Sequence, residues 1–339
     1  MTREGDVLTL TDCPLDPIAG WTLAVVGYGN QGAAQAQNLR DSGFRVVVGG
    51  DPERPSARRA QADGFGILPL GAVVSQAELI LLTVPDELHR EVVGVLLGGR
   101  TTSMRTCAWV LAHGFSLVHD PPPIPRDHDV FVVAPAGPGV QVRSRFVEGN
   151  GVPALLAVHQ DASGQADPRA RAYAAGIGAA RAGLLRSTVR DEVDIDLFGE
   201  QAVLCGGMNA LTQAAFDTLV NAGYSPEASY LECVHQLRLT AELVEKYGIE
   251  GMRRRISTTA LFGDLTRGPR IGGPELRSAM DGILDDVRSG RFAREWLETR
   301  NRETGWAREA PEVARHDLLE AAGETIRGLF RPLPQAEKD

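Results

Sequence analysis

The sequence predicts an α/β protein in which a doubly wound parallel sheet is followed by an all-helical domain. Short apolar runs that suit buried strands alternate with helical patterns up to about residue 188. From residue 189 onward such runs stop, and long amphipathic patterns separated by proline and glycine replace them. We therefore expect one domain over residues 1–188, a second over 189–331 and a polar tail over 332–339.

The individual elements follow from the same patterns. Strands are expected at 23–26, 46–48, 79–84, 108–111, 130–134 and 154–158, and helices of the first half at 33–40 and 57–62. Segment 66–69 reads as a short connection, and the proline-rich segment 121–126 as a stiff loop. Helices of the second half are expected at 197–204, 210–221, 226–247, 273–289 and 311–329.

Bulk properties narrow the class of protein. The formal net charge of −9 argues against sequence-independent nucleic-acid binding, which needs a basic surface. No apolar run approaches the length of a membrane-spanning helix, and the first residues lack a signal-peptide pattern. The four cysteines are widely separated, so neither a disulfide framework nor structural zinc is expected. These features predict a cytoplasmic protein that binds neither membrane nor nucleic acid.

The turn after the first strand carries glycines at the spacing of a dinucleotide-binding motif. Gly27, Gly29 and Gly32 form a G-x-G-x-x-G pattern between an expected strand and an expected helix. The first glycine permits the tight turn, the second lets the backbone approach a pyrophosphate, and the third lets the helix pack on the strand. The N-terminus of the helix then binds the phosphates. The alternative is a tight glycine-rich turn without chemical meaning.

The expected cofactor residues lie at the carboxyl ends of the strands, where ligands of open α/β sheets bind. Asp51 ends the second strand, where an acid binds a ribose 2′-OH and repels a 2′-phosphate, which slightly favours NADH. Arg54, Ser56 and Arg58 follow and suit the phosphate of NADPH, so both cofactors stay open. The full expected set is Gly27, Tyr28, Gly29, Asn30, Gln31, Gly32, Asp51, Arg54, Ser56, Pro85, Asp86, His113 and Gly139.

Two carboxylates in the second half predict a magnesium site. Asp196 and Glu200 are four residues apart, which places them on one face of a helix. Hard oxygen ligands with open positions suit Mg²⁺. The apolar residues around them indicate a helix buried nearly all round, in which carboxylates need a partner. The alternative is a solvated acidic helix start.

Further candidates are a second polar pair, a histidine and a serine. Glu232 and Gln236 have the same spacing within another apolar helix. Glu232 suits a hydrogen bond to a substrate or to a metal-bound water, and the alternative is a pair with a neighbour such as Arg238. His113 follows a buried strand at the cofactor edge, although a lone histidine is more often structural. Ser257 suits a substrate carboxylate or a helix cap.

Several segments together resemble the ketol-acid reductoisomerases in their short-chain form, over about residues 5–330. The acidic segment that begins at residue 196 is long and specific. The matching segments are VGYGNQG at 26–32, AHGF at 112–115, GNGVPA at 149–154, AVHQDAS at 157–163, DLFGEQAVLCGG at 196–207, AGY at 222–224 and ISTTA at 256–260.

The resemblance implies a fold, a chemistry and an assembly. It implies a Rossmann domain joined to a knotted all-helical domain, and a homodimer whose active site is shared across the interface. With NADH or NADPH and Mg²⁺, the family rearranges a small 2-hydroxy-2-alkyl-3-oxo acid and reduces the product, in branched-chain amino-acid biosynthesis. Asp196 and Glu200 match the family's magnesium ligands. Glu232 and Ser257 match substrate contacts, and His113 matches the histidine beside the nicotinamide.

Two positions depart from the family's pattern. The family's Pro-Lys-Gly-Pro-Gly has Ala136 in place of the lysine, and its Glu-Cys-x-His-Glu has Gln236 in place of the last carboxylate. An amide accepts hydrogen bonds but cannot hold or relay a proton as a carboxylate does. Both changes affect the alkyl migration, whereas the residues that match hydride transfer remain.

Three functions therefore stay open. The first is a reductase of a small 2-keto acid or a related carbonyl or imine, with the isomerase step weak or lost. The second is a true ketol-acid reductoisomerase, which converts 2-acetolactate to 2,3-dihydroxyisovalerate. The third is a catalytically silent relative that binds nucleotide. The chain keeps Asp196, Glu200 and Glu232, which argues against the third function, because buried carboxylates are costly without a ligand.

Overall fold

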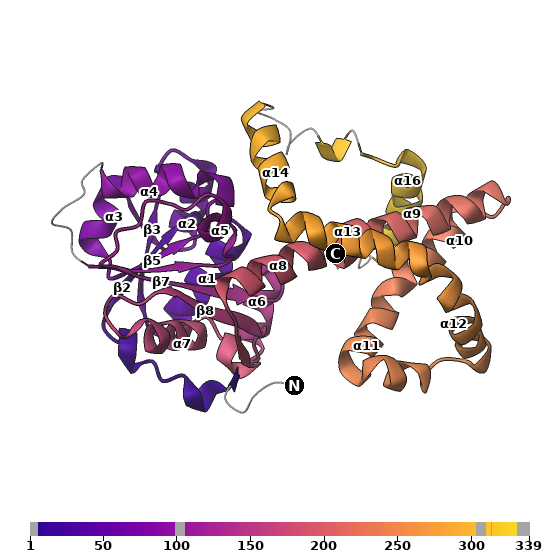
Figure 1. The fold of residues 1–339 in the computed structure, drawn as a ribbon, viewed down its shortest axis with the longest axis horizontal. Coiled ribbons are helices and arrows are strands. Elements are labelled where there is room, and N and C mark those ends of the chain that lie inside the picture. Colours follow the sequence, from indigo (N-terminus) through magenta and orange to yellow (C-terminus); the bar gives the residue numbers. More distant parts are fainter. Residues whose placement is uncertain (1–5, 99–105, 303–309, 313, 331–339) are drawn as a thin grey trace, which may run out of the picture. The chain divides into compact units, whose positions relative to one another are not determined.

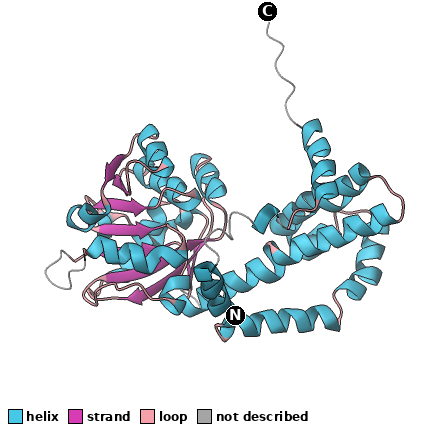
Figure 2. Ribbon diagram, turned by 90° about the horizontal axis from the view of Figure 1, so that it is seen from above, coloured by secondary structure: helices cyan, strands magenta, loops and turns pink. Residues whose placement is uncertain are grey.

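The computed structural model describes residues 6–98, 106–302, 310–312 and 314–330 (Figure 1). The chain divides into two compact units, Met1–Ile195 and Asp196–Asp339. The first unit combines a sheet with helices, and the second is helical (Figure 2). The division falls within helix α8 (Val189–Gly199), which begins where the second domain is expected to start.

The first unit is built on a nine-stranded sheet with the order β1-β9-β8-β7-β6-β5-β2-β3-β4 in the described residues. The strands from β4 to β7 all run parallel. Their order is that of a Rossmann sheet, which confirms the doubly wound sheet. The nine strands are β1 (Val7–Leu8), β2 (Thr22–Val26), β3 (Arg45–Gly49), β4 (Gly66–Leu68), β5 (Leu79–Leu82), β6 (Ala108–Leu111), β7 (Asp129–Pro135), β8 (Ala154–Gln160) and β9 (Leu184–Arg186).

The sheet differs from the sequence prediction at both edges. Segment 66–69, expected as a connection, contains strand β4, which is too short to give an apolar run. Strand β8 runs antiparallel to β7, and β1 runs antiparallel to β9. Strand direction depends on how the chain returns to the sheet, which the residues of a strand do not encode.

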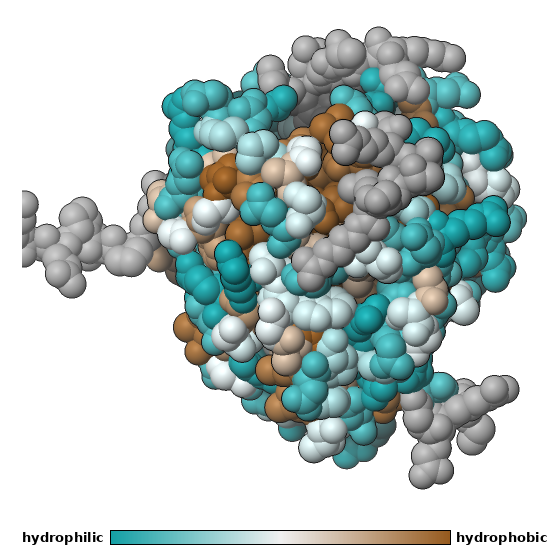
Figure 3. Space-filling model, turned by 90° about the vertical axis from the view of Figure 1, so that its left-hand side faces the viewer, coloured by the Kyte–Doolittle hydropathy of each residue, from teal (hydrophilic) through white to brown (hydrophobic). Residues whose placement is uncertain are grey.

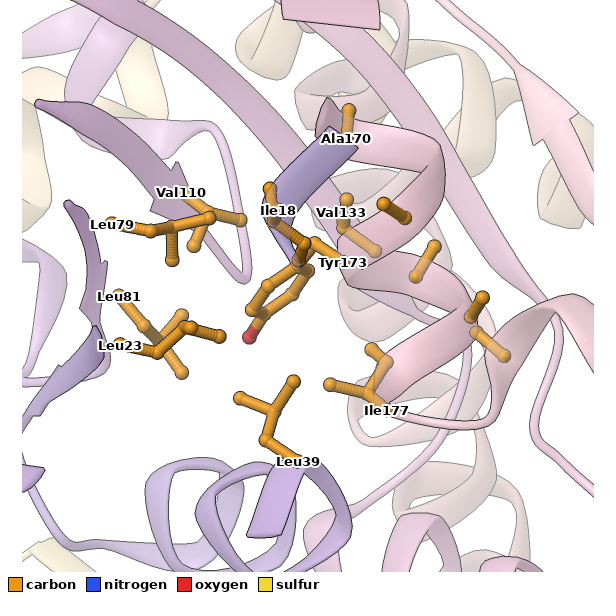
Figure 4. Packing of buried hydrophobic residues seen from close by; sticks show 14 of the residues in the cluster. Ile18, Leu23, Leu39, Leu79, Leu81, Val110, Val133, Ala170, Tyr173 and Ile177 are labelled. Carbon is orange, nitrogen blue, oxygen red and sulfur yellow. The ribbon is translucent and has the colours of Figure 1, made fainter. Parts of the chain in front are cut away.

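Helices cover both faces of the sheet, and two apolar cores result. One core surrounds Tyr173 of α7, with Leu23 of β2 and Leu39 of α1 beside it (Figure 4). The other core lies on the opposite face, because alternate strand residues such as Val26 point there. The helices of this unit are α1 (Asn30–Asp41), α2 (Pro55–Ala62), α3 (Leu70–Gln76), α4 (His89–Leu97), α5 (Phe115–His119), α6 (Gly139–Val147), α7 (Ala166–Gly176) and the first part of α8.

One face of the molecule is mixed in polarity (Figure 3). In the view of Figure 3, hydrophilic residues surround brown hydrophobic patches. No helix in the described ranges combines the length and the apolar character needed to cross a membrane.

The second unit has a small core of its own. Phe216 and Tyr230 are buried there against Ala322 and Ile326. Two of its segments, Glu200–Leu204 and Leu231–His235, are π-helical, a form found often at functional sites. The α-helices are α9 (Gly206–Asn221), α10 (Pro226–Tyr230), α11 (Gln236–Arg253), α12 (Thr258–Ile271), α13 (Pro274–Arg288), α14 (Arg291–Arg302) and α16 (Asp317–Leu329).

Many apolar side chains of this second unit are exposed. The sequence suggested that the helix over 197–204 is buried nearly all round. Val203 and Leu204 are 51% and 61% exposed, so this expectation is wrong for the single chain. Apolar residues predict burial, but the pattern does not say whether the same chain or another one covers them. Other exposed members are Met208, Leu211, Leu231, Leu239, Phe262, Leu265 and Ile271.

Candidate functional site

The glycine turn after β2 has the geometry that a dinucleotide requires. Gly27 has φ +104°, and a β-carbon on it would lie 2.6 Å from the Val84 amide nitrogen. A β-carbon on Gly32 would lie 1.9 Å from the Gly27 carbonyl oxygen. A β-carbon on Gly29, in contrast, meets nothing within 4 Å. The first and third glycines are therefore required by packing, and the second leaves open the space where a pyrophosphate fits.

Two helix N-termini meet beside this turn. Helix α1 begins at Asn30, and its first N–H groups lack acceptors within the helix. A β-carbon on Gly139, the first residue of α6, would lie 2.1 Å from the Asn30 carbonyl oxygen. The Gln31 side chain donates to the Gly137 carbonyl oxygen at 2.9 Å. The structure thus brings Asn30, Gln31 and Gly139 together, and positive helix ends favour an anion there.

The side chain of Tyr28 belongs to the core. It is 2% exposed, packs on the ring of Phe65, and donates its hydroxyl to Asp63 at 2.7 Å. Burial, together with this bond, raises the pKa of Tyr28 to about 12. Arg59 donates to the Tyr28 carbonyl oxygen. Any contact of Tyr28 with a cofactor therefore involves its backbone and not its phenol.

The loop after β3 carries charges of both signs. Asp51 is exposed, and its carboxylate accepts the amide of Glu53 at 3.0 Å. Glu53 also pairs with Arg58 at 2.9 Å. Arg54 has no carboxylate within ion-pair distance in the described part of the chain, and Ser56 is exposed in the first turn of α2. The loop retains both the acid that suits NADH and the guanidinium that suits NADPH.

The loops after β5 and β6 are joined by a buried histidine. Pro85 and Asp86 follow β5 as expected, and His89 begins α4 just beyond them. The His89 ring contacts the Val84 carbonyl oxygen and the Ser116 hydroxyl. Burial lowers the pKa of His89 to about 4. Sequence reasoning missed this residue, because a single histidine at a helix start has no informative spacing.

The expected His113 is held by a carboxylate that sequence reasoning missed. Its Nδ1 lies 2.8 Å from Oε1 of Glu192, and the Gly114 amide donates to Oε2 of the same residue at 2.8 Å. Glu192 is 1% exposed, whereas the His113 side chain is 20% exposed. A β-carbon on Gly114 would lie 2.8 Å from Glu192 Oε2, so glycine is needed for this approach. The carboxylate fixes the orientation of the imidazole.

The two expected magnesium ligands follow Glu192 along the helix. Asp196 lies one turn after it in α8 and is half-buried, and Glu200 opens the π-helical segment and is exposed. The expectation that both carboxylates are buried is therefore wrong for this chain alone. No group of three metal-ligating side chains occurs among the residues described. Two carboxylates nevertheless fit Mg²⁺, which usually keeps several waters and takes one or two protein carboxylates.

The polar pair of the second unit is internally bonded. Gln236 donates its amide to Oε2 of Glu232, and both side chains are exposed. Arg238 pairs instead with Glu242, so Glu232 does pair with a neighbour, but that neighbour is Gln236 and not Arg238. The amide holds the Glu232 carboxylate in one orientation without supplying a charge.

Ser257 caps α12. Its hydroxyl oxygen accepts the Ala260 amide at 3.1 Å. The hydroxyl proton stays available to a substrate carboxylate, because a serine can accept and donate together.

Comparison with known proteins identifies the family of the chain. The family model described as "Acetohydroxy acid isomeroreductase, NADPH-binding domain" matches residues 17–183, and "Ketol-acid reductoisomerase, C-terminal domain" matches residues 189–331. An NADH-preferring ketol-acid reductoisomerase from an uncultured archean superposes with a TM-score of 0.90 at 37% identity, over 96% of this chain and 99% of that chain.

More distant structures share only the fold. A putative oxidoreductase from Jannaschia sp. CCS1 has a TM-score of 0.58 at 14% identity, over 79% of this chain and 97% of that one. A 1-pyrroline-5-carboxylate reductase from Streptococcus pyogenes has a TM-score of 0.54 at 15% identity, over 79% of this chain and 98% of that one.

The Rossmann sheet, the open glycine turn and these matches define an NAD(P)H-dependent oxidoreductase. Within that class, the chain belongs to the ketol-acid reductoisomerase family. The resemblance read from the sequence is thereby confirmed.

Gly29→Val tests the glycine turn. The backbone at Gly29 is extended (φ −86°, ψ −151°) and its β-carbon site is open, so valine is expected to leave the fold intact. Because the added methyl groups occupy the pyrophosphate space, NADH binding is expected to weaken by about 30-fold, as measured by fluorescence titration. Gly66→Val in β4, another open position, is the control and keeps the affinity. Unchanged binding by Gly29→Val contradicts the assignment.

Proposed function

We propose that this protein is an NAD(P)H-dependent, Mg²⁺-assisted reductase of a small 2-keto acid or a related carbonyl or imine. In this proposal the alkyl-migration step of the family is weak or lost. The observation that carries it is the pair of departures, Ala136 and Gln236, in a chain that keeps the other matched residues. The chain has fewer of the charged groups that stabilise a tertiary alkoxide during migration, while the residues that match hydride transfer remain.

The residues of the first unit bind and orient the cofactor. The glycine turn and the N-termini of α1 and α6 receive its pyrophosphate. Asp51 binds the ribose of its adenosine end. His113, held by Glu192, stands at the carboxyl edge of the sheet, where the nicotinamide end lies. When bound, the reduced nicotinamide supplies a hydride.

The residues of the second unit handle the substrate. Asp196 and Glu200 would hold Mg²⁺, whose chemistry there is to polarise the substrate carbonyl. Ser257 donates to the substrate carboxylate. Glu232 is the group of its pair that holds or moves a proton, because Gln236 has no titratable group.

The loss of these charged groups lowers the rate of alkyl migration more than the rate of reduction. Rearrangement forms an alkoxide beside a polarised ketone, and a fixed cation and a proton-relaying carboxylate stabilise that charge. Removing one such contact commonly lowers a rate by about 10²-fold. Ala136 and Gln236 together remove two.

A true ketol-acid reductoisomerase of branched-chain amino-acid biosynthesis is the second candidate. The 37% identity to an enzyme of that name, over 96% of this chain, favours it. A catalytically silent relative is the third, and the pairing of His113 with Glu192 argues against it, since a silent protein has no chemical need for an oriented imidazole.

We extend the proposal to a homodimer, which the exposed apolar side chains of the second unit support, and the resemblance to the family implies that its active site is shared across the interface. Contiguous exposed apolar surface marks protein interfaces. We place the dimer in the cytoplasm, with the helical units forming its interface. Sedimentation equilibrium is the check, and a stable monomer at micromolar concentration contradicts this assembly.

Asp51 is proposed to make NADH the preferred cofactor. Asp51→Ser removes the acid that bonds the ribose hydroxyls and repels a 2′-phosphate. The ratio of kcat/KM for NADH to that for NADPH is expected to fall about 10-fold. Glu53→Gln removes an acid from the same loop but keeps an acceptor oxygen for Arg58, and it is expected to change the ratio little. Equal effects of the two variants would show that only the total charge of the loop matters.

The proposed function is tested with the purified protein. NADH oxidation is followed with 3-hydroxy-3-methyl-2-oxobutyrate, in the presence of Mg²⁺ and then of a chelator. We expect turnover that requires Mg²⁺. Nucleotide binding without turnover of any small keto acid would instead support the silent relative.

A further inference from the structure

A buried histidine outside the proposed chemistry joins two loops at the cofactor edge of the sheet. The His89 side chain is 2% exposed. Its Nε2 lies 3.1 Å from the Val84 carbonyl oxygen, and its Nδ1 lies 2.7 Å from the Ser116 hydroxyl. A ring this deeply buried satisfies both nitrogens through these protein partners.

The two contacts assign the tautomer of His89. A carbonyl oxygen only accepts, so Nε2 carries the proton and donates to Val84. Nδ1 is then the acceptor, and the Ser116 hydroxyl donates to it. The ring is neutral at neutral pH, because burial lowers its pKa to about 4. His89 therefore acts as a fixed connector with one donor and one acceptor.

Both partners of His89 belong to segments of the cofactor site. Val84 lies in the loop after β5. A β-carbon on Gly27 of the glycine turn would lie 2.6 Å from the amide nitrogen of Val84. Ser116 lies in α5, three residues after His113, and is fully buried. The imidazole thus bridges the loop beside the glycine turn and the helix that follows His113.

The strand order shows which end of a dinucleotide these loops meet. Asp51 follows β3, on one side of β2, and an acid there binds the adenosine ribose. Strands β5 and β6 lie on the other side of β2. A dinucleotide that crosses the sheet at β2 therefore brings its nicotinamide end to the loops after β5 and β6.

We propose that His89 is a positioning residue for the nicotinamide end of the cofactor. It holds the Val84 carbonyl and the Ser116 helix in one arrangement and so fixes the two loops between which the nicotinamide lies. The inference rests on the proposed function, because it takes the nicotinamide dinucleotide as the ligand of this edge.

The test compares two ligands that differ at one end. NADH carries the nicotinamide, and ADP-ribose has the same adenosine and pyrophosphate without it. His89→Leu removes both bonds, and it is expected to weaken NADH binding about 10-fold while ADP-ribose binding changes less than about 2-fold. Affinities are measured by titration calorimetry, with circular dichroism as the check on folding.

Two further variants separate positioning from packing. His89→Gln keeps an amide N–H for Val84 and an amide oxygen for Ser116, so it is expected to restore NADH affinity to within about 3-fold of the wild type. Ser116→Ala removes one bond only and is expected to weaken NADH binding about 3-fold, again with ADP-ribose unchanged. This variant carries the test if His89→Leu does not fold.

The outcomes are distinguishable. Selective loss of NADH affinity with rescue by His89→Gln supports the inference. If the wild-type protein binds both ligands, the positioning role is refuted when the variants keep their NADH affinity or lose affinity equally for both ligands. Either result leaves the proposed function untouched. If the wild-type protein binds neither ligand, the proposed function fails and the inference fails with it.

Discussion

Asp196→Asn is expected to lower the rate of NADH-dependent reduction by about 10³-fold. Asparagine keeps the size of the side chain but removes one of the two anionic groups proposed to bind Mg²⁺. A single remaining carboxylate holds the cation weakly, and the substrate carbonyl is then less polarised. The measurements are kcat at saturating substrate and Mg²⁺ affinity by titration calorimetry.

A matched control lies on the same helix. Asp191→Asn makes the same change of charge at an exposed position in the first turn of α8. It is expected to keep the rate and the Mg²⁺ affinity of the wild type. If Asp196→Asn retains more than about a third of the activity, the cation is not held by this residue.

Restoring the lysine at position 136 and the carboxylate at position 236 is expected to restore the rearrangement step. The double variant Ala136→Lys with Gln236→Glu should raise the conversion of 2-acetolactate at least about 10²-fold. It returns a fixed cation and a carboxylate that relays a proton, and Ala136 is exposed, so a lysine is accommodated there. The product is measured by chromatography, independently of NADH oxidation.

The single variants show why both changes are needed. Gln236→Glu alone places a carboxylate four residues from Glu232, in place of the amide that now donates to it. Two like charges at this spacing repel unless a cation joins them. We expect each single variant to gain less than about a tenth of the effect of the double variant. No gain from the double variant would refute our account of these positions.

The parts of the fold that the sequence predicts are those with a local cause. Strand β5 reads as a strand because its four residues are apolar and buried on both faces. Helix α1 is expected from the glycine spacing, although it begins at Asn30, three residues before the expected start at residue 33. Strand β4 and the reversed direction of β8, itself expected as a strand at 154–158, were beyond such reasoning, because pairing with a neighbour, and not the residues themselves, defines them.

The candidate site divides in the same way. The glycine turn and the pair Asp196 and Glu200 have short, regular spacings, so the pattern reveals them. Glu192 is 79 positions from His113, and only the folded sheet brings the two together. A buried acid four residues before Asp196 was the available signal, since it continues the same helix face.

Exposure was the property that the sequence described least well. The helices around Glu200 and Glu232 read as buried because they are rich in apolar residues, yet both carboxylates are exposed in the single chain. Hydrophobic patterning gives the face that will be covered and not the molecule that covers it.

The most direct test of the central claim compares two substrates side by side. With NADH and Mg²⁺, kcat/KM is measured for 2-acetolactate, which must rearrange before reduction, and for 3-hydroxy-3-methyl-2-oxobutyrate, which is already rearranged. We predict that the protein reduces the second at least about 10²-fold more efficiently than the first. Equal efficiency for the two acids would show that the isomerase survives Ala136 and Gln236, and would contradict the proposed function.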